Sequence, residues 1–313
     1  MTFNRNTLGS YSRTVATTVR VLKRPRAQAI LTSQRQVTRA QLAGISVQPA
    51  HIQVTTRSAR QLAASAQLFV DRSHSGPRGD MRVYADVDAR RTVAHETLGN
   101  AVDIPEDRIE RAIQVLAEHR GPKQAALFKA VFDATAVSRG SENLAFAHQV
   151  PGHDFSVVML TRPEYEVGDL FSVLIHEYVH VLQHATGHWF FQGGLPPEGE
   201  EESGNRIIME ADALTRERQL GAIAAREFGM PSIIAGQLER TDILLGNVIK
   251  LLEVHTLLQT VRGDVPFVNQ HTFSAHALGA SLLVVANEVL GQEAVAEAFR
   301  RGDLSVLDAL LDI

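Results

Sequence analysis

An apolar segment with helical spacing near the middle of the chain constrains the fold most, because polar residues stand inside it at fixed intervals. Gly168-Asp169 supplies a turn and an N-cap ahead of it. Apolar residues then follow at helical spacing: Leu170, Phe171, Leu174, Val181 and Leu182. Within this pattern stands the run His176-Glu177-Tyr178-Val179-His180. The segment therefore predicts a helix, ended near Thr186-Gly187, that carries two histidines and a glutamate.

His176 and His180 are spaced for metal binding. Residues four apart lie on one face of a helix, so both imidazoles can be directed at one ion, with Zn–N distances of about 2.0–2.1 Å. Glu177 lies one step round the helix, where it can take a proton from an attacking water. The HExxH pattern is typical of zinc metalloproteases. The alternative is a core helix that carries two hydrogen-bonded histidines.

A catalytic zinc usually has three protein ligands, and the third is open between His184, His188 and Glu210. His184 continues the helical stripe but lies about 12 Å along the axis from His176, too far to share the ion on an unbroken helix. His188 could fold back only over a very short connection. Glu210 stands among apolar residues of a second predicted helix, where a buried carboxylate needs a partner. A solvated glutamate on an amphipathic face is the alternative.

The motif and its surroundings resemble the gluzincin group of zincin metallopeptidases. The resemblance rests on HEYVH followed by Val181-Leu182-Gln183, and on Glu210-Ala211-Asp212-Ala213. More narrowly, residues 155–220 resemble bacterial HExxHxxQ metallopeptidase domains, some of them linked to contractile injection systems and toxins. The resemblance implies that His176, His180 and Glu210 bind Zn²⁺ and that Glu177 is the general base. Asp212 would orient a ligand histidine.

The expected fold class is α+β and mainly helical, with a zincin-like core of a small sheet and an active-site helix. Strands are predicted at 81–87 and 155–161, and residues 140–152 are expected to be a loop. In the resemblance, strand 155–161 is the sheet edge that receives the substrate backbone. Further helices are predicted at about 104–119, 123–137, 206–228, 237–262, 273–290 and 292–311. The glycine-rich and acidic stretch 193–204 could line the cleft or act as a lid.

Two later histidines are candidates for stabilising a developing oxyanion, which such chemistry requires. His271 and His276 form the close histidine pair downstream of Glu210. Ordinary surface or capping roles are the alternative for both. His95-Glu96 begins like the zinc motif, but Gly99 stands where the second histidine belongs, so a structural role is expected there.

The charge distribution divides the chain near residue 70. Residues 1–70 contain ten Arg and Lys and no Asp or Glu, whereas residues 71–313 contain 21 basic and 35 acidic residues. We therefore expect a basic, Ser/Thr-rich leader or delivery segment at 1–70 and a zincin-like metallopeptidase domain at 71–313. The segment would contact secretion or injection machinery, or an acidic surface. The alternatives are a solvated tail and a segment folded against the acidic body.

Composition limits the remaining options. No apolar run reaches the roughly 18 residues of a membrane span, and no early apolar stretch predicts a classical signal peptide. The absence of cysteine rules out disulfides and thiolate ligands and agrees with a His/Glu site. Nucleic-acid binding is disfavoured, because the basic segment lacks interleaved aromatic residues and zinc-finger spacing.

The function expected from these observations is that of a zinc-dependent endopeptidase acting on protein or peptide substrates, as a secreted or injected effector or toxin. The rival is a non-catalytic zincin-fold module that docks on a partner assembly. Glu177 favours the enzyme, because a purely structural zinc needs no general base.

Overall fold

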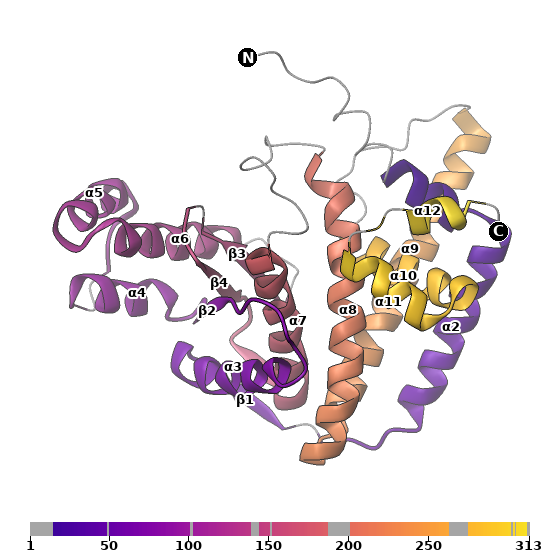
Figure 1. Ribbon diagram of the computed structural model, residues 1–313, viewed down its shortest axis with the longest axis horizontal. Helices are drawn as coiled ribbons and strands as arrows, with labels where there is room; N and C mark the ends of the chain where they lie inside the picture. The colour runs from indigo at the N-terminus through magenta and orange to yellow at the C-terminus, as the bar shows by residue number, and fades with distance from the viewer. Residues whose placement is uncertain are drawn as a thin grey trace. The chain divides into compact units, whose positions relative to one another are not determined.

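The chain is mainly helical with small sheets, as expected for the α+β class (Figure 1). The computed structural model describes residues 15–313 except 49, 101–102, 139–143, 151, 187–200, 263–274, 302, 304 and 312–313. The chain forms two compact units. Unit 1 comprises Met1–Val47, Gly187–Gln219 and Ile234–Ile313, and unit 2 comprises Gln48–Thr186 and Leu220–Ile233.

Unit 2 is built round a three-stranded sheet with the order β2-β4-β3. β2 (Asp80–Ala85) runs parallel to β4 (Phe155–Leu160), and β3 (Ala145–Gln149) runs antiparallel to it. All six residues of β4 are buried, as a continuous apolar run predicts for a strand covered on both faces. A separate antiparallel pair joins β1 (His51–Gln53) to β5 (Glu164–Glu166).

Two expectations about this sheet were wrong. β4 is the central strand and not an edge, because β2 and β3 bind its two sides. Residues 145–149 are strand β3 and not loop; their extended conformation depends on pairing with β4, which their own sequence does not reveal. The edge of this sheet nearest in sequence to the zinc motif is therefore β3.

Helices cover both faces of the sheet in unit 2 (Figure 1). Alternate residues of the strands point to opposite faces. Val83 and Val158 join a core with α3 (Thr56–Asp71) and α7 (Val167–Thr186). Tyr84 and Val157 join a second core, formed with α4 (Ala89–Leu98), α5 (Ile109–Arg120) and α6 (Pro122–Ser138). A short 3₁₀ helix, η1 (Glu106–Arg108), precedes α5.

Unit 1 is helical in the part that the structure describes. It contains α2 (Pro25–Ala43), α10 (Ala275–Leu290), α11 (Gln292–Arg301) and α12 (Ser305–Ala309). It also contains the first part of α8 (Glu201–Phe228) and most of α9 (Ser232–Arg262). Every residue from Ala277 to Ala286 is buried, so α10 is the central helix of this core, with α2 and α11 against it.

The predicted helices largely agree with these bounds. One predicted helix and the predicted division of the chain near residue 70 differ from the structure. The helix expected at 292–311 is divided into α11 and α12. The expected boundary near residue 70 coincides with the end of α3, whose buried residues belong to the core of unit 2, and it is not a boundary between the units. No helix in the described part of the chain is long and apolar enough to cross a membrane.

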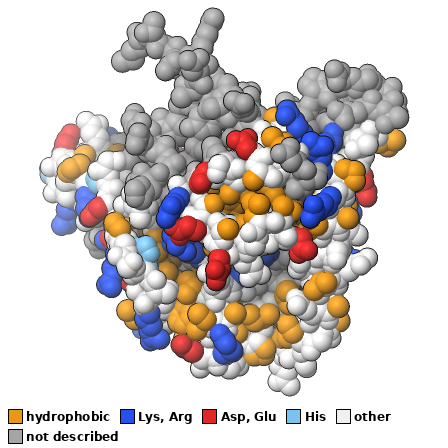
Figure 2. All heavy atoms as spheres, turned by 45° about the vertical axis from the view of Figure 1, so that its right-hand side comes forward, with side chains coloured by type: hydrophobic (Ala, Val, Ile, Leu, Met, Phe, Trp, Pro, Cys, Tyr) orange, Lys and Arg blue, Asp and Glu red, His pale blue; other side chains and the backbone are white. Residues whose placement is uncertain are grey.

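The described part of the basic segment is folded, and several of its arginines have partners within unit 1. Arg24 donates to the Leu311 carbonyl at 2.8 Å. Arg35 and Arg39 each donate to Asp242 at 2.8 Å. On the face in Figure 2, basic and acidic side chains lie next to one another, with hydrophobic side chains among them. Arg35 and Arg39 of α2 are thus paired with Asp242 in the folded chain, and a delivery role for residues 1–70 stays a prediction.

Candidate metal centre

The two motif histidines meet on one face of α7. Their Nε2 atoms lie 3.1 Å apart, and both side chains are buried. Two nitrogen ligands of a tetrahedral zinc, each at 2.0–2.1 Å, would be about 3.3 Å apart. The pair is therefore close to the separation that a shared ion requires. The donor set and the geometry of α7 both fit zinc.

Gln183 fixes the orientation of one histidine, a role that the sequence reasoning missed. The Oε1 atom of Gln183 lies 2.7 Å from Nδ1 of His180, and the Gln183 side chain is buried. An amide oxygen accepts, so Nδ1 of a neutral His180 carries the proton and Nε2 keeps its lone pair. The signal was present in the sequence, because residues three apart also share a helix face.

Glu177 is buried, with 3% of its surface exposed. It lies one residue after His176 on α7, hence on a neighbouring face of the helix. A carboxylate shielded from bulk water can act as a general base for a group that reaches it.

Tyr178 is buried in the core and binds α7 to α3 through its hydroxyl group. Its hydroxyl donates to Asp71 at 2.9 Å and accepts from Gln67 at 3.3 Å. Burial, the largest influence, raises the pKa of Tyr178 to about 12. Gly168, at the start of α7, lies close to Ser232 and Ile233; an added Cβ would be 2.8 Å from the Ile233 nitrogen. These contacts fix the helix that carries the histidines.

His184 is turned to the sheet. Its Nδ1 lies 3.4 Å from the Ser156 hydroxyl on β4. Burial first, and then the proximity of His180 and His148, lowers the pKa of His184 to about 3. This histidine is therefore neutral at physiological pH and contributes to packing.

Glu210 is a buried carboxylate of unit 1, with 4% of its surface exposed. Its Oε2 lies 3.1 Å from Nε2 of His276, in the first turn of α10. Gly279 permits this approach: an added Cβ would lie 2.7 Å from the Ile207 carbonyl oxygen and 2.9 Å from Cβ of Glu210. The burial argues against the alternative of a solvated glutamate. It also agrees with the expectation that this acid needs a partner.

The remaining candidate residues differ in what the structure shows of them. Asp212 is buried and accepts from Arg216 at 3.2 Å, so its predicted role beside a ligand histidine stays a prediction. His188 and His271 lie outside the described residues, as does most of the stretch 193–204. Glu96 of the incomplete motif accepts from Tyr84 at 2.7 Å and from Arg60, which confirms its structural role.

In comparisons with protein-family models, curated proteins and solved structures, nothing matches the chain.

Proposed function

We propose that the chain is a zinc-dependent endopeptidase with a zincin-like core. The observation that carries the proposal is the buried pair His176 and His180 on α7, with Nε2 atoms 3.1 Å apart, together with the burial of Glu177 on the same helix. A buried imidazole pair of this separation suits a shared cation. The order of strand β4 followed by α7, packed on the same sheet, supports a zincin-like core round the motif.

We assign Glu210 as the third ligand. All three side chains are buried, and each offers one ligand atom. The assignment of Glu210 is supported by α8, a single helix that carries both Glu210 and Leu220. Leu220 of α8 shares a core with Leu170 of α7. Glu210 lies ten residues before Leu220 on the same helix, about 15 Å along its axis.

The residues of the site suit peptide hydrolysis. When bound, zinc lowers the pKa of water and polarises a carbonyl group. Glu177 would take a proton from the attacking water and pass it to the leaving amine. Gln183 would keep the ring of His180 in its ligand orientation. His276 would orient Glu210 through their contact, or donate to the developing oxyanion, the role first expected for it and for His271.

Strand β3 is the proposed binding edge for substrate. Among the described strands, β3 pairs with β4 on one side and has no second partner strand. β3 also contacts α7, the helix of the motif. An extended peptide can add to such an edge through main-chain hydrogen bonds, which makes an unfolded or extended polypeptide the expected substrate.

The rival function, a non-catalytic module that docks on a partner assembly, makes a different prediction for Glu177. Incubation of the purified chain with a mixture of unfolded proteins should yield fragments, and Glu177→Gln should reduce cleavage by at least about 100-fold while zinc stays bound. Glu118→Gln, on the exposed face of α5, is the matched control and should cleave normally. Cleavage that persists in Glu177→Gln would exclude the proposed base. A zinc-loaded wild type that cleaves nothing would favour the docking module.

Delivery by secretion or injection machinery remains part of the proposal, supported by the charge of residues 1–70. Arg24, which precedes α2, and Arg35 and Arg39 of α2 already bind groups of unit 1. Delivery would therefore depend on contacts beyond these pairs. A fusion of residues 1–70 to a reporter protein should be exported by a cell that exports the full chain. A reporter that stays inside would exclude delivery through this segment alone.

A further inference from the structure

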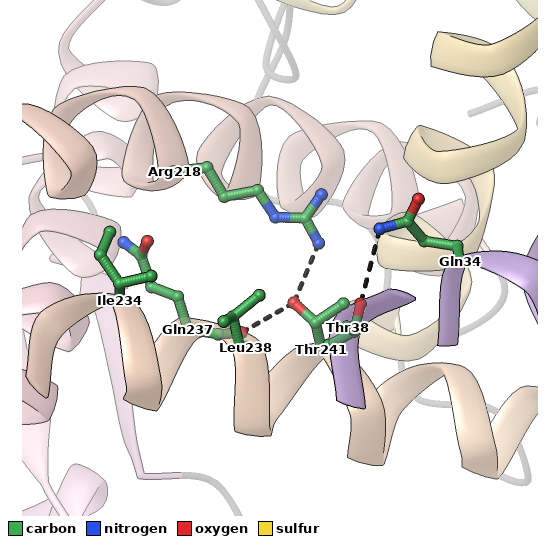
Figure 3. Close-up of a pocket in the computed structure, with 7 residues that line it drawn as sticks. All are labelled: Gln34, Thr38, Arg218, Ile234, Gln237, Leu238 and Thr241. Atoms are coloured by element: carbon green, nitrogen blue, oxygen red, sulfur yellow. Dashed lines mark hydrogen bonds between the residues drawn. The ribbon is translucent and has the colours of Figure 1, made fainter. Parts of the chain in front are cut away.

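A cavity of unit 1 is lined by residues other than those of the proposed zinc site. It has a volume of about 150 Å³ and is lined by side chains of α2, α8 and α9 (Figure 3). Gln34 and Thr38 come from α2, and Arg218 comes from α8. The wall from α9 includes Thr241 and the aliphatic residues Ile234 and Leu238. Water occupies about 30 Å³ per molecule in the liquid, so the cavity has room for a group the size of phosphate.

Arg218 gives the cavity its charge. Its Nη2 donates to the Thr241 hydroxyl at 3.0 Å, and that hydroxyl in turn donates to the Gln237 carbonyl at 2.7 Å (Figure 3). The partner of Arg218 in this contact is thus neutral. Burial lowers the pKa of Arg218, and Glu217 offsets the effect only in part. A guanidinium has five N–H donors, so this one retains capacity for a ligand.

Glu217, the carboxylate next to Arg218 in the chain, has its own basic partner. Glu217 accepts from Arg240, which neighbours the cavity. The Glu217 carboxylate is therefore engaged by the Arg240 guanidinium, and an anion in the cavity would stabilise the buried charge of Arg218. On α2, Arg35 and Arg39 likewise share the single carboxylate of Asp242. Basic groups gathered in this way attract an anion.

Neutral donors stand opposite Arg218. The Gln34 amide donates to the Thr38 hydroxyl at 3.5 Å, a long hydrogen bond that is easily exchanged for a better one (Figure 3). An amide N–H, a hydroxyl and a guanidinium on different helices can together bind several oxygens of a tetrahedral group. The aliphatic side chains of Ile234 and Leu238 offer no competing acceptor.

From this combination we infer that unit 1 contains a binding site for a small oxyanion of the phosphate class, with Arg218 as its central donor and Gln34 and Thr38 opposite. The oxyanion could be free phosphate or the head of a phosphate monoester, which share the same recognition chemistry. The site is independent of the proposed hydrolysis, and its occupation would hold α2, α8 and α9 together.

Titration of the full chain with inorganic phosphate, followed by calorimetry at constant ionic strength, tests the site. The expected result is saturable binding to one site, with a dissociation constant in the millimolar range or below. Arg218→Gln should weaken binding at least tenfold, and Thr38→Val should weaken it severalfold. Arg226→Gln, an exposed arginine of the same helix, is the control and should bind as the wild type does.

Two further titrations distinguish this site from other sources of phosphate binding. Binding should persist in His176→Ala, because phosphate captured by a metal ion would be lost there. Titration with glycerol phosphate distinguishes a phosphate monoester from free phosphate as the ligand. If glycerol phosphate binds more tightly than inorganic phosphate, the ligand is a monoester. If the two bind equally, the ligand is the free anion. Arg218→Lys keeps the charge and serves if Arg218→Gln does not fold; it too should bind more weakly, since lysine lacks the guanidinium fork. Absence of saturable binding, or unchanged binding in a folded Arg218 variant, would overturn the inference.

Discussion

Oε1 of Gln183 lies 2.7 Å from Nδ1 of His180, one turn beyond the second histidine of the motif. This contact assigns the proton of a neutral His180 to Nδ1 and leaves Nε2 facing His176, 3.1 Å away. The tautomer required for metal binding is therefore set within α7 itself. A helix that carries the ligands and their orienting group can form the histidine half of the site before other elements pack on it.

Gln183→Leu should weaken zinc binding without unfolding the chain. Leucine has a similar volume but cannot accept from Nδ1, and loss of such an orienting contact typically costs about 10–100-fold in metal affinity. Competition with a chromogenic chelator measures the affinity. Gln114→Leu, on the exposed part of α5, should leave it unchanged. An unaltered affinity in Gln183→Leu would show that the contact does not orient the ligand.

Gly279→Ala should destabilise unit 1 by about 1–3 kcal/mol, the usual cost of overpacking a well-packed core. The added methyl group would lie 2.7 Å from the backbone carbonyl oxygen of Ile207, which cannot move without shifting α8. Gly246→Ala is the matched control, because its methyl group would meet the flexible end of Arg35. Denaturant unfolding gives both values. Equal stability of the two variants would contradict the close packing of α10 on α8.

His184 should make the stability of the fold depend on pH. Burial holds its pKa at about 3 in the folded state, against 6.5 in the unfolded chain. Below pH 6.5 the unfolded state therefore binds one more proton, and the free energy of unfolding falls as the pH falls, by up to about 1.4 kcal/mol per pH unit.

Denaturant unfolding at pH 7 and pH 5 measures this effect. The loss of stability between the two values should be smaller in His184→Gln than in the wild type by about 2 kcal/mol. His95→Gln, at an exposed position, should retain the full loss. An identical loss in His184→Gln would mean that His184 is solvated in the folded protein.

The sequence was sufficient for local features and insufficient for partners distant in the chain. The apolar spacing round His176 predicted α7, and the run at 155–161 predicted the buried strand that the structure has at Phe155–Leu160. The position of that strand in the sheet depends on residues 80–85 and 145–149, and no local pattern encodes this pairing. Absence of acidic residues suggested a leader at 1–70, yet the periodicity that forms α2 and α3 was present there as well.

In the candidate site, too, the sequence predicted the residues that are close in the chain and not the contacts between distant ones. The two histidines and Glu177 followed from spacing alone, since four residues make one helical turn. The contact of Glu210 with His276 joins residues on separate helices, and only the packing of α10 at Gly279 brings it about. The cavity round Arg218 was likewise hidden, because its walls come from three helices.

Zinc content tests the central claim most directly. Elemental mass spectrometry on the purified, zinc-reconstituted chain should give about one zinc per molecule, as three protein ligands predict. His176→Ala and Glu210→Ala should each lose the metal, and His95→Ala should keep it. A folded wild type without zinc would contradict the metalloenzyme account. Zinc that stays bound in Glu210→Ala would contradict the assignment of the third ligand and favour His188.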